Sequence, residues 1–194
     1  MGEVDDGLKM MRRGSFMYLL AFFILLLAIA FTIVTFKDYK APEFMKRAFI
    51  AALGIFVTFI MEIMLAVMGF IYFFIAAEKL RKVNKDYGIG RKGMILQLFG
   101  FCLIFVLMPL AFLLKEFNNP LILLLAITGA VVILIGVIFF GIMLLRMKDL
   151  DRGFETAGIL YLIGIAIPIL IVFAMISIYM SSSRAMKRLS ATKA

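Results

Sequence analysis

Residues 49–77, FIAALGIFVTFIMEIMLAVMGFIYFFIAA, form the stretch that decides the fold class. Glu62 is the one charged residue among these 29 positions. A helix needs about 20 apolar residues to cross the hydrocarbon core of a bilayer, which is roughly 30 Å thick. Buried apolar β-strands end after about 4–8 residues. The stretch therefore predicts a transmembrane helix.

Four more apolar blocks are long enough to span a membrane, so the same reasoning predicts a transmembrane helix in each. The chain has 194 residues, of which 65% are hydrophobic, and its mean hydropathy is +1.12. Only helices and closed barrels satisfy their own backbone in lipid, and no alternating barrel pattern is visible. We predict an all-α integral membrane protein with a single transmembrane domain, residues 1–194. The five predicted transmembrane helices cover about 15–36, 49–77, 94–114, 121–145 and 158–181.

Catalytic and metal-binding residue types are scarce. The chain contains no histidine, and Cys102 is its single cysteine. Histidine is the commonest metal ligand and the usual general base. Neither a pair of carboxylates nor a nucleophile set is apparent. We therefore predict that the protein is not an enzyme and that it holds no cofactor and no metal.

The basic residues lie almost entirely between the apolar blocks. The chain carries 21 Lys and Arg against 12 Asp and Glu, a net charge of +9. In such positions they set topology and contact anionic lipid headgroups. No soluble segment is large enough to present a basic face to nucleic acid, so we predict lipids, and not nucleic acid, as partners of these loops.

The distribution of Lys and Arg also predicts an orientation in the cell membrane. With five crossings, the side of the N-terminus carries 12 of these residues and the opposite side carries 9. Cytoplasmic segments are enriched in Lys and Arg. The rule favours a multi-pass protein with a cytoplasmic N-terminus and an external C-terminus.

A glycine motif between two apolar blocks resembles a phosphate-binding fingerprint. Gly88, Gly90 and Gly93 form G-x-G-x-x-G, which binds dinucleotides when it follows a β-strand and opens a helix. Here a transmembrane block precedes it and another follows. We therefore interpret the glycines as part of a turn between two membrane helices.

The same loop belongs to an internal repeat. LRKVNKDYGIGRKG from Leu80 and LRMKDLDRGFETAG from Leu145 share the pattern L-R-x4-D-x-G-x4-G at an offset of 65 residues. The second and third predicted helices would thus be a copy of the fourth and fifth, as a parallel repeat. The repeated residues are Arg81, Asp86, Gly88 and Gly93 in the first copy and Arg146, Asp151, Gly153 and Gly158 in the second.

Each repeated residue has an expected role. The first glycines, Gly88 and Gly153, suit a left-handed turn after a helix. The second glycines, Gly93 and Gly158, suit a close backbone approach at the start of the next helix. The arginine of each copy is expected to reach lipid phosphates or to pair with the aspartate of the same copy.

Glu62 is the residue most open to a functional role. A charge at the centre of a membrane helix is costly. On a helical projection it shares a stripe of small residues, which indicates a face that contacts protein. We predict that it hydrogen-bonds between helices with Gln97, Thr128 or Tyr161, and a proton or cation relay is the alternative. The stripe consists of Ala51, Thr58, Ala66, Gly69 and Ala76.

Two other residue types mark features of the helices. Pro109 and Pro168 lie inside the third and fifth blocks, where we expect kinks. Gly129 and Gly136 are seven residues apart and predict a close-packing face on the fourth helix.

The chain resembles a group of uncharacterised small multi-pass archaeal membrane proteins, grouped as domains of unknown function. The resemblance lies in GLKMMRRGSFMYLL, LRKVNKDYGIGRKGMILQL and DRGFETAGILYLIGIAIPIL, about a quarter of the chain. It implies a helical membrane protein and no catalytic residues.

These observations leave two main hypotheses on function. The first is an accessory or scaffold subunit that packs against copies of itself or against other membrane proteins. The second is a small proton- or cation-coupled transporter or channel subunit that uses Glu62. Lipid or membrane-shape handling by the basic loops is a third option.

Overall fold

The computed structural model describes residues 2–36, 44–114 and 120–191. No strand occurs in these ranges, and every α-helix except α5 is long and apolar enough to cross a membrane, which makes five. The all-α fold and the five apolar helices of spanning length are thus confirmed. The elements are α1 (Gly2–Phe36), α2 (Phe44–Val83), η1 (Lys85–Tyr87), α3 (Gly88–Leu114), α4 (Pro120–Arg146), η2 (Met147–Asp149), α5 (Gly153–Ile163) and α6 (Ile169–Ala191), where η denotes a 3₁₀ turn.

The predicted single helix over 158–181 is wrong. The structure has two helices there, because α5 ends at Ile163 and α6 begins at Ile169. Gly164 ends α5, and Pro168 cannot donate a backbone hydrogen bond to a continuing helix. Short i→i+3 and i→i+4 bonds satisfy the turn; for example, the Ala166 N–H donates to the Ile163 carbonyl at 3.0 Å. Backbone that lies at membrane depth needs such partners.

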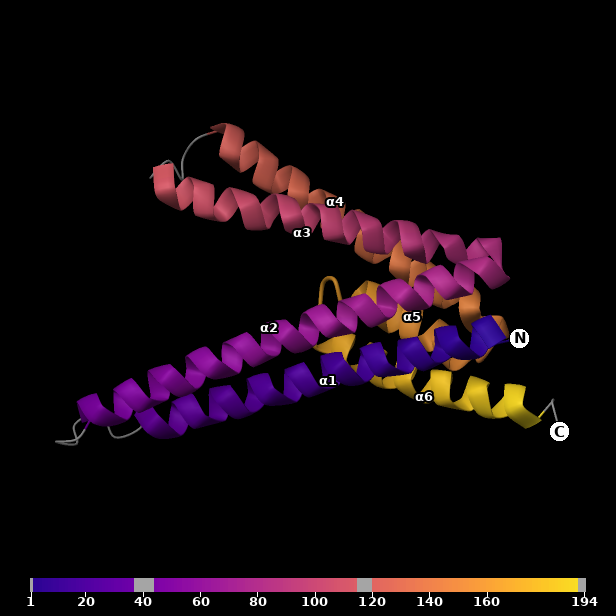
Figure 1. Ribbon diagram of the computed structural model, residues 1–194, viewed down its shortest axis with the longest axis horizontal. Coiled ribbons are helices and arrows are strands. Elements are labelled where there is room, and N and C mark those ends of the chain that lie inside the picture. Colours follow the sequence, from indigo (N-terminus) through magenta and orange to yellow (C-terminus); the bar gives the residue numbers. More distant parts are fainter. Residues whose placement is uncertain (1, 37–43, 115–119, 192–194) are drawn as a thin grey trace.

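The break reverses the chain direction, so α5 and α6 form a helical hairpin. Eleven residues of α5 rise about 16 Å, roughly half of a bilayer core. The turn between α5 and α6 lies about midway along the molecule, and the described chain begins and ends at the same end of it (Figure 1). The prediction that the termini lie on opposite sides of the membrane counted 158–181 as a full crossing, and no such single helix exists.

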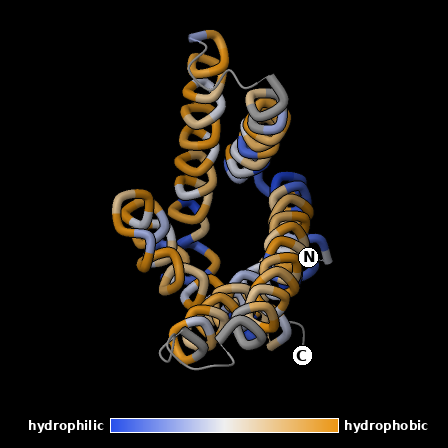
Figure 2. The backbone as a smooth tube through the Cα atoms, turned by 90° about the vertical axis from the view of Figure 1, so that its left-hand side faces the viewer, coloured by the Kyte–Doolittle hydropathy of each residue, from blue (hydrophilic) through white to orange (hydrophobic). Residues whose placement is uncertain are grey.

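The four long helices form two arms, α1–α2 and α3–α4, that diverge from a common end (Figure 1). Glycines hold each arm together. A Cβ atom on Gly14 would lie 3.1 Å from the Gly69 carbonyl oxygen, and one on Gly100 would lie 2.7 Å from the Gly129 carbonyl oxygen. The close-packing face predicted on α4 at Gly129 and Gly136 is confirmed. Hydrophobic residues run along most of both arms (Figure 2).

The buried core lies where the arms meet, not along their length. It joins the first turns of α1, the last turns of α2 and α4, the first turns of α3 and α5, and α6 from Met175 onward. These segments, with η1 and η2, are called the basic end below. Its largest fully buried side chains include Leu8, Leu80, Phe140, Met147 and Phe154.

The internal repeat stays a prediction, and the structure supports only its turns. Gly88 is the first residue of α3 and Gly153 is the first residue of α5. A 3₁₀ turn precedes each helix, although its position in the repeat differs by three residues. The following helices differ in length, since α3 has 27 residues and α5 has 11.

Candidate functional site

Most of the positive charge gathers at the basic end. Of the 21 Lys and Arg, three lie in the first turns of α1, six between 78 and 93, three between 146 and 152, and three in α6. Ion pairs connect these segments: Lys79 contacts Asp6 at 2.9 Å, and Arg184 contacts Asp151 at 3.0 Å. Fifteen cations therefore share one end of the molecule.

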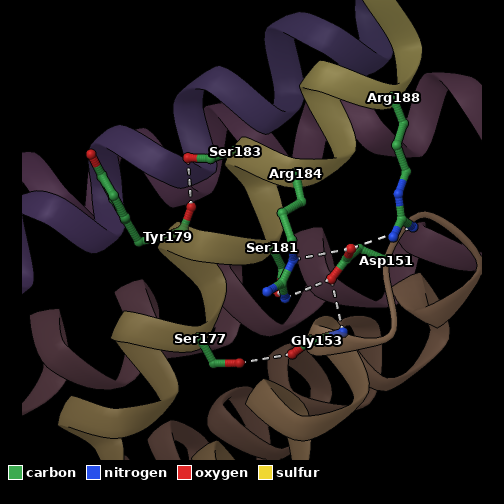
Figure 3. A network of polar contacts seen from close by, with 8 residues as sticks. All are labelled: Asp151, Gly153, Ser177, Tyr179, Ser181, Ser183, Arg184 and Arg188. Atoms are coloured by element: carbon green, nitrogen blue, oxygen red, sulfur yellow. Dashed lines mark hydrogen bonds and ion pairs between the residues drawn. The ribbon is translucent and has the colours of Figure 1, made fainter. Parts of the chain in front are cut away.

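Asp151, two residues before the start of α5, is the centre of a polar network at this end (Figure 3). Its side chain is only 3% exposed. Arg184 donates to it from Nη2 at 3.0 Å and from Nε at 3.3 Å, and Arg188 Nη1 lies 3.5 Å from its Oδ2. The Gly153 N–H donates to Oδ1 at 2.9 Å, and Ser177 donates to the Gly153 carbonyl. The network fastens the start of α5 to α6.

These contacts hold Asp151 in its charged form. Burial alone raises the pKa of this carboxyl group, but hydrogen bonds from Arg184 and the Gly153 N–H outweigh it and place the pKa below its usual value. A buried carboxylate is tolerated when cations and N–H donors satisfy its oxygens. The network has a structural role, because both oxygens of its carboxylate already contact cations or N–H donors.

Of the two roles expected of the repeated arginines, pairing with the aspartate of the same copy is wrong, and contact with lipid phosphates stays a prediction. Arg81 pairs with Glu78 at 3.0 Å, and Arg146 pairs with Asp86 of the other copy, through the Asp86 carbonyl at 3.1 Å and the carboxylate at 4.0 Å. The reason is the hairpin, which brings Arg184 back to Asp151 and leaves Arg146 beside η1.

The roles predicted for the second glycines are confirmed. A Cβ on Gly93 would lie 2.6 Å from the Gly136 carbonyl oxygen, and one on Gly158 would lie 2.9 Å from the Leu145 nitrogen. Both glycines thus let a helix approach the backbone of α4.

The left-handed turn expected at the first glycines is wrong. Gly88 has φ −62° and ψ −19°, and Gly153 has no positive φ, because each already belongs to the right-handed helix that it opens. Their backbone conformation is one that any residue can adopt. The third glycine of the fingerprint-like motif, Gly90, is packed against the Met143 side chain.

The structure does not join the four predicted intramembrane polar residues into one site. Thr128 donates to the Leu124 carbonyl of its own helix at 2.8 Å. Gln97 is 6% exposed and lies beside Tyr161 in the interior. Glu62 forms no hydrogen bond or ion pair within the described ranges. Only Gln97 and Tyr161 are brought together.

The position of Glu62 follows from the packing of α2 on α1. The small-residue stripe faces α1, as predicted for a protein-contacting face: Ala51 and Ala76 are fully buried, and Gly69 meets Tyr18. Since Gly54 meets Phe31 further along this antiparallel pair, Glu62 lies opposite the α1 segment 19–30, which has no polar side chain. Helix α3 diverges from α2 and cannot supply Gln97 there.

Cavities and metal-ligand clusters give no further support to a site at Glu62. A cavity of about 720 Å³ at the basic end and one of about 270 Å³ between α1 and α2 are both lined by residues other than Glu62 and Gln97. Within the part of the chain that the structure describes, no group of three His, Cys, Asp or Glu could hold a metal ion.

Sequence reasoning missed Arg184, Arg188, Ser177 and Ser181 as partners of the α5 start. Pro168 was the one available signal, since a proline in a hydrophobic block can end a helix as well as kink it. The pairing itself spans 33 positions and has no local signature.

Comparison with known proteins agrees with the resemblance to an uncharacterised family grouped as a domain of unknown function. The model of a family described as Protein of unknown function (DUF973) matches residues 5–194. No curated protein and no solved structure matches the chain. With nearly its full length matched and five helices apolar enough to span a membrane, the chain belongs to the DUF973 family.

Proposed function

We propose that the protein is a non-enzymatic membrane subunit that associates in the bilayer with copies of itself or with other membrane proteins. The observation that carries this proposal is the position of Glu62. It lies near the middle of a 35-residue apolar span and has no hydrogen-bond partner within the described chain. Its side chain is partly buried.

A carboxyl group without a hydrogen-bond partner is costly in lipid. Insertion scales assign about 2.5–3.5 kcal/mol to a charged Asp at the centre of a helix. A donor or acceptor from another chain removes part of this cost, and such bonds contribute about 0.6–2 kcal/mol between membrane helices. Protein partners are therefore favoured over lipid beside this residue.

The shape of the molecule supports the same function. In the most apolar 18-residue segments of α1 and α2 only 6% of residues are buried, and in the corresponding segment of α4 only 11% are buried. The arms pack internally and diverge from each other, so most of their surface is free to meet lipid or other helices (Figure 1). A subunit built to associate needs such surfaces.

The experiment is to compare assemblies of the wild-type protein with Glu62→Gln and Glu62→Leu variants in mild detergent, by native mass spectrometry. Glutamine keeps a donor and an acceptor, so we expect it to retain the assembly, while leucine releases it. Thr128→Val is the matched control, because that hydroxyl bonds its own helix. A monomeric wild-type protein, or a Glu62→Leu variant that assembles normally, would contradict the proposal.

We also propose that the basic end, with both ends of the described chain, lies on the cytoplasmic side of the cell membrane. At least 15 of the 21 Lys and Arg are at this end. Five crossings would put only 12 of them on the side of the N-terminus. Cytoplasmic loops near membrane helices carry this excess. The hairpin α5–α6 would then enter the membrane and return to the cytoplasm.

A further inference from the structure

The cavity at the basic end has the size and position of a ligand site. It opens between the last turn of α2, η1, the first turns of α3 and the end of α4, and its volume is about 720 Å³. Small-molecule sites occupy about 300–1,000 Å³. Six cationic side chains line it: Arg81, Lys82, Lys85, Arg91, Lys92 and Arg146.

The protein neutralises only part of this charge. Arg81 and Arg91 share Glu78, and Arg146 contacts Asp86, the carboxylate that lines the cavity. The three lysines take part in no ion pair within the described residues. They are also exposed, so they are available to an anion: Lys82, Lys85 and Lys92.

Glycines of the loop bring these cations together. Gly88 leaves room for the Arg81 stem, since a Cβ there would lie 3.1 Å from Arg81 Cγ. Gly93 lets α3 contact the backbone of α4 at Gly136, which places the first turn of α3 beside the end of α4. The motif that resembles a nucleotide fingerprint thus builds a cationic cavity without a β-strand.

One wall of the cavity is apolar and continues along the outside of α3. Ile89, Ile95 and Phe139 line the cavity, and Ile95 is 44% exposed. One turn further, Leu98 and Phe99 are 49% and 61% exposed on the same helix. A ligand with a phosphate group and hydrocarbon chains would meet cations at one end and apolar surface at the other.

We propose that this cavity binds the phosphate headgroup of an anionic membrane lipid, with its chains along α3. Lysine and arginine bind phosphate oxygens through charge-assisted hydrogen bonds. Basic pockets between helices at the cytoplasmic surface are suited to such headgroups. The site is separate from Glu62 and does not depend on protein partners.

The test titrates the full chain in mild detergent with phosphatidylglycerol or with phosphatidylcholine of the same chain length and counts bound lipids by native mass spectrometry. The site variant is Lys82→Gln/Lys85→Gln/Lys92→Gln. The control Lys148→Gln/Arg152→Gln/Lys187→Gln has the same net charge, and its residues are exposed at the basic end outside the cavity lining.

We expect saturable binding that prefers phosphatidylglycerol, a loss of about tenfold or more in the site variant, and little change in the control. Each cation near an anionic headgroup contributes roughly fivefold in affinity. An equal loss in both variants would overturn the site, since surface charge alone would explain it. Equally tight binding of inorganic pyrophosphate would assign the cavity to a soluble phosphate compound and overturn the lipid assignment.

Discussion

Arg184 and Asp151 are 33 positions apart, yet two hydrogen bonds from the guanidinium group to the carboxylate join them at 3.3 and 3.0 Å (Figure 3). This contact closes the α5–α6 hairpin at the end opposite its turn. It joins the C-terminal half of α6 to the start of α5.

Replacing Arg184 with Ala should loosen the hairpin. The change removes two charge-assisted hydrogen bonds, each of a kind worth about 1.5–3 kcal/mol, but Arg184 is 48% exposed and Arg188 remains, so we expect a total loss of about 1–3 kcal/mol. Hydrogen exchange of residues 153–191 measures it. Lys187→Ala, on the same helix, is the control and should leave the exchange unchanged.

The stabilisation from Asp151 should depend on pH in a defined direction. Its pKa is lowered in the folded protein, so its contribution is fully present above the unfolded value of about 3.9 and is lost as pH falls through the folded value. The melting temperatures of the wild-type protein and of Asp151→Asn should differ by a constant amount between about pH 7 and 5, and the difference should shrink below about pH 4. Convergence above pH 5 would be inconsistent with the lowered pKa.

Gly93→Val should separate α3 from α4. A Cβ at this position would lie 2.6 Å from the Gly136 carbonyl oxygen, a backbone atom that cannot move aside, and overpacking typically costs about 1–3 kcal/mol. Gly54→Ala is the control, because its Cβ would make an ordinary contact of 3.6 Å with Phe31. A Gly93→Val variant with the melting temperature of the wild-type protein would show that the α3–α4 arm repacks without loss of stability.

Hydrophobic block length predicted most of the fold, because a run of over 20 apolar residues has few stable states in water or lipid. It could not predict the reversal at 164–168. A proline such as Pro168 is tolerated inside many membrane helices, and the contact that favours the hairpin joins Asp151 to a residue of another helix.

For individual residues too, local requirements were predictable and contacts between distant segments were not. The glycines at 93 and 158 were predictable, since close approach is a local requirement at a helix start. The partner of Arg146, and the lack of one for Glu62 within the described residues, were not predictable, because both depend on which helices diverge. The cationic cavity required three separate segments to meet, and the sequence showed only that each was basic.

Glu62→Gln also separates association from transport. If the residue serves only packing, the variant should assemble as the wild-type protein does, and neither protein should show pH-dependent flux in liposomes. Flux that is present in the wild-type protein and abolished in a folded, assembled Glu62→Gln variant would favour a proton-coupled role. The Glu62→Leu variant serves as the control for loss of assembly.

The two ends of the molecule should lie on opposite sides of the membrane. In a Cys102→Ala background, Ser190→Cys reports the end of α6, and Pro120→Cys reports the far tip of the α3–α4 arm. Because α5 and α6 form a hairpin whose turn lies midway along the molecule, both ends of the hairpin should be on the side of the N-terminus (Figure 1). We expect an impermeant thiol reagent to label Pro120→Cys from outside intact cells and Ser190→Cys only after the membrane is opened. Labelling of both positions from outside would mean that 153–191 crosses the membrane as a whole, and the hairpin would then be wrong. Labelling of Ser190→Cys alone would keep the hairpin and invert the orientation.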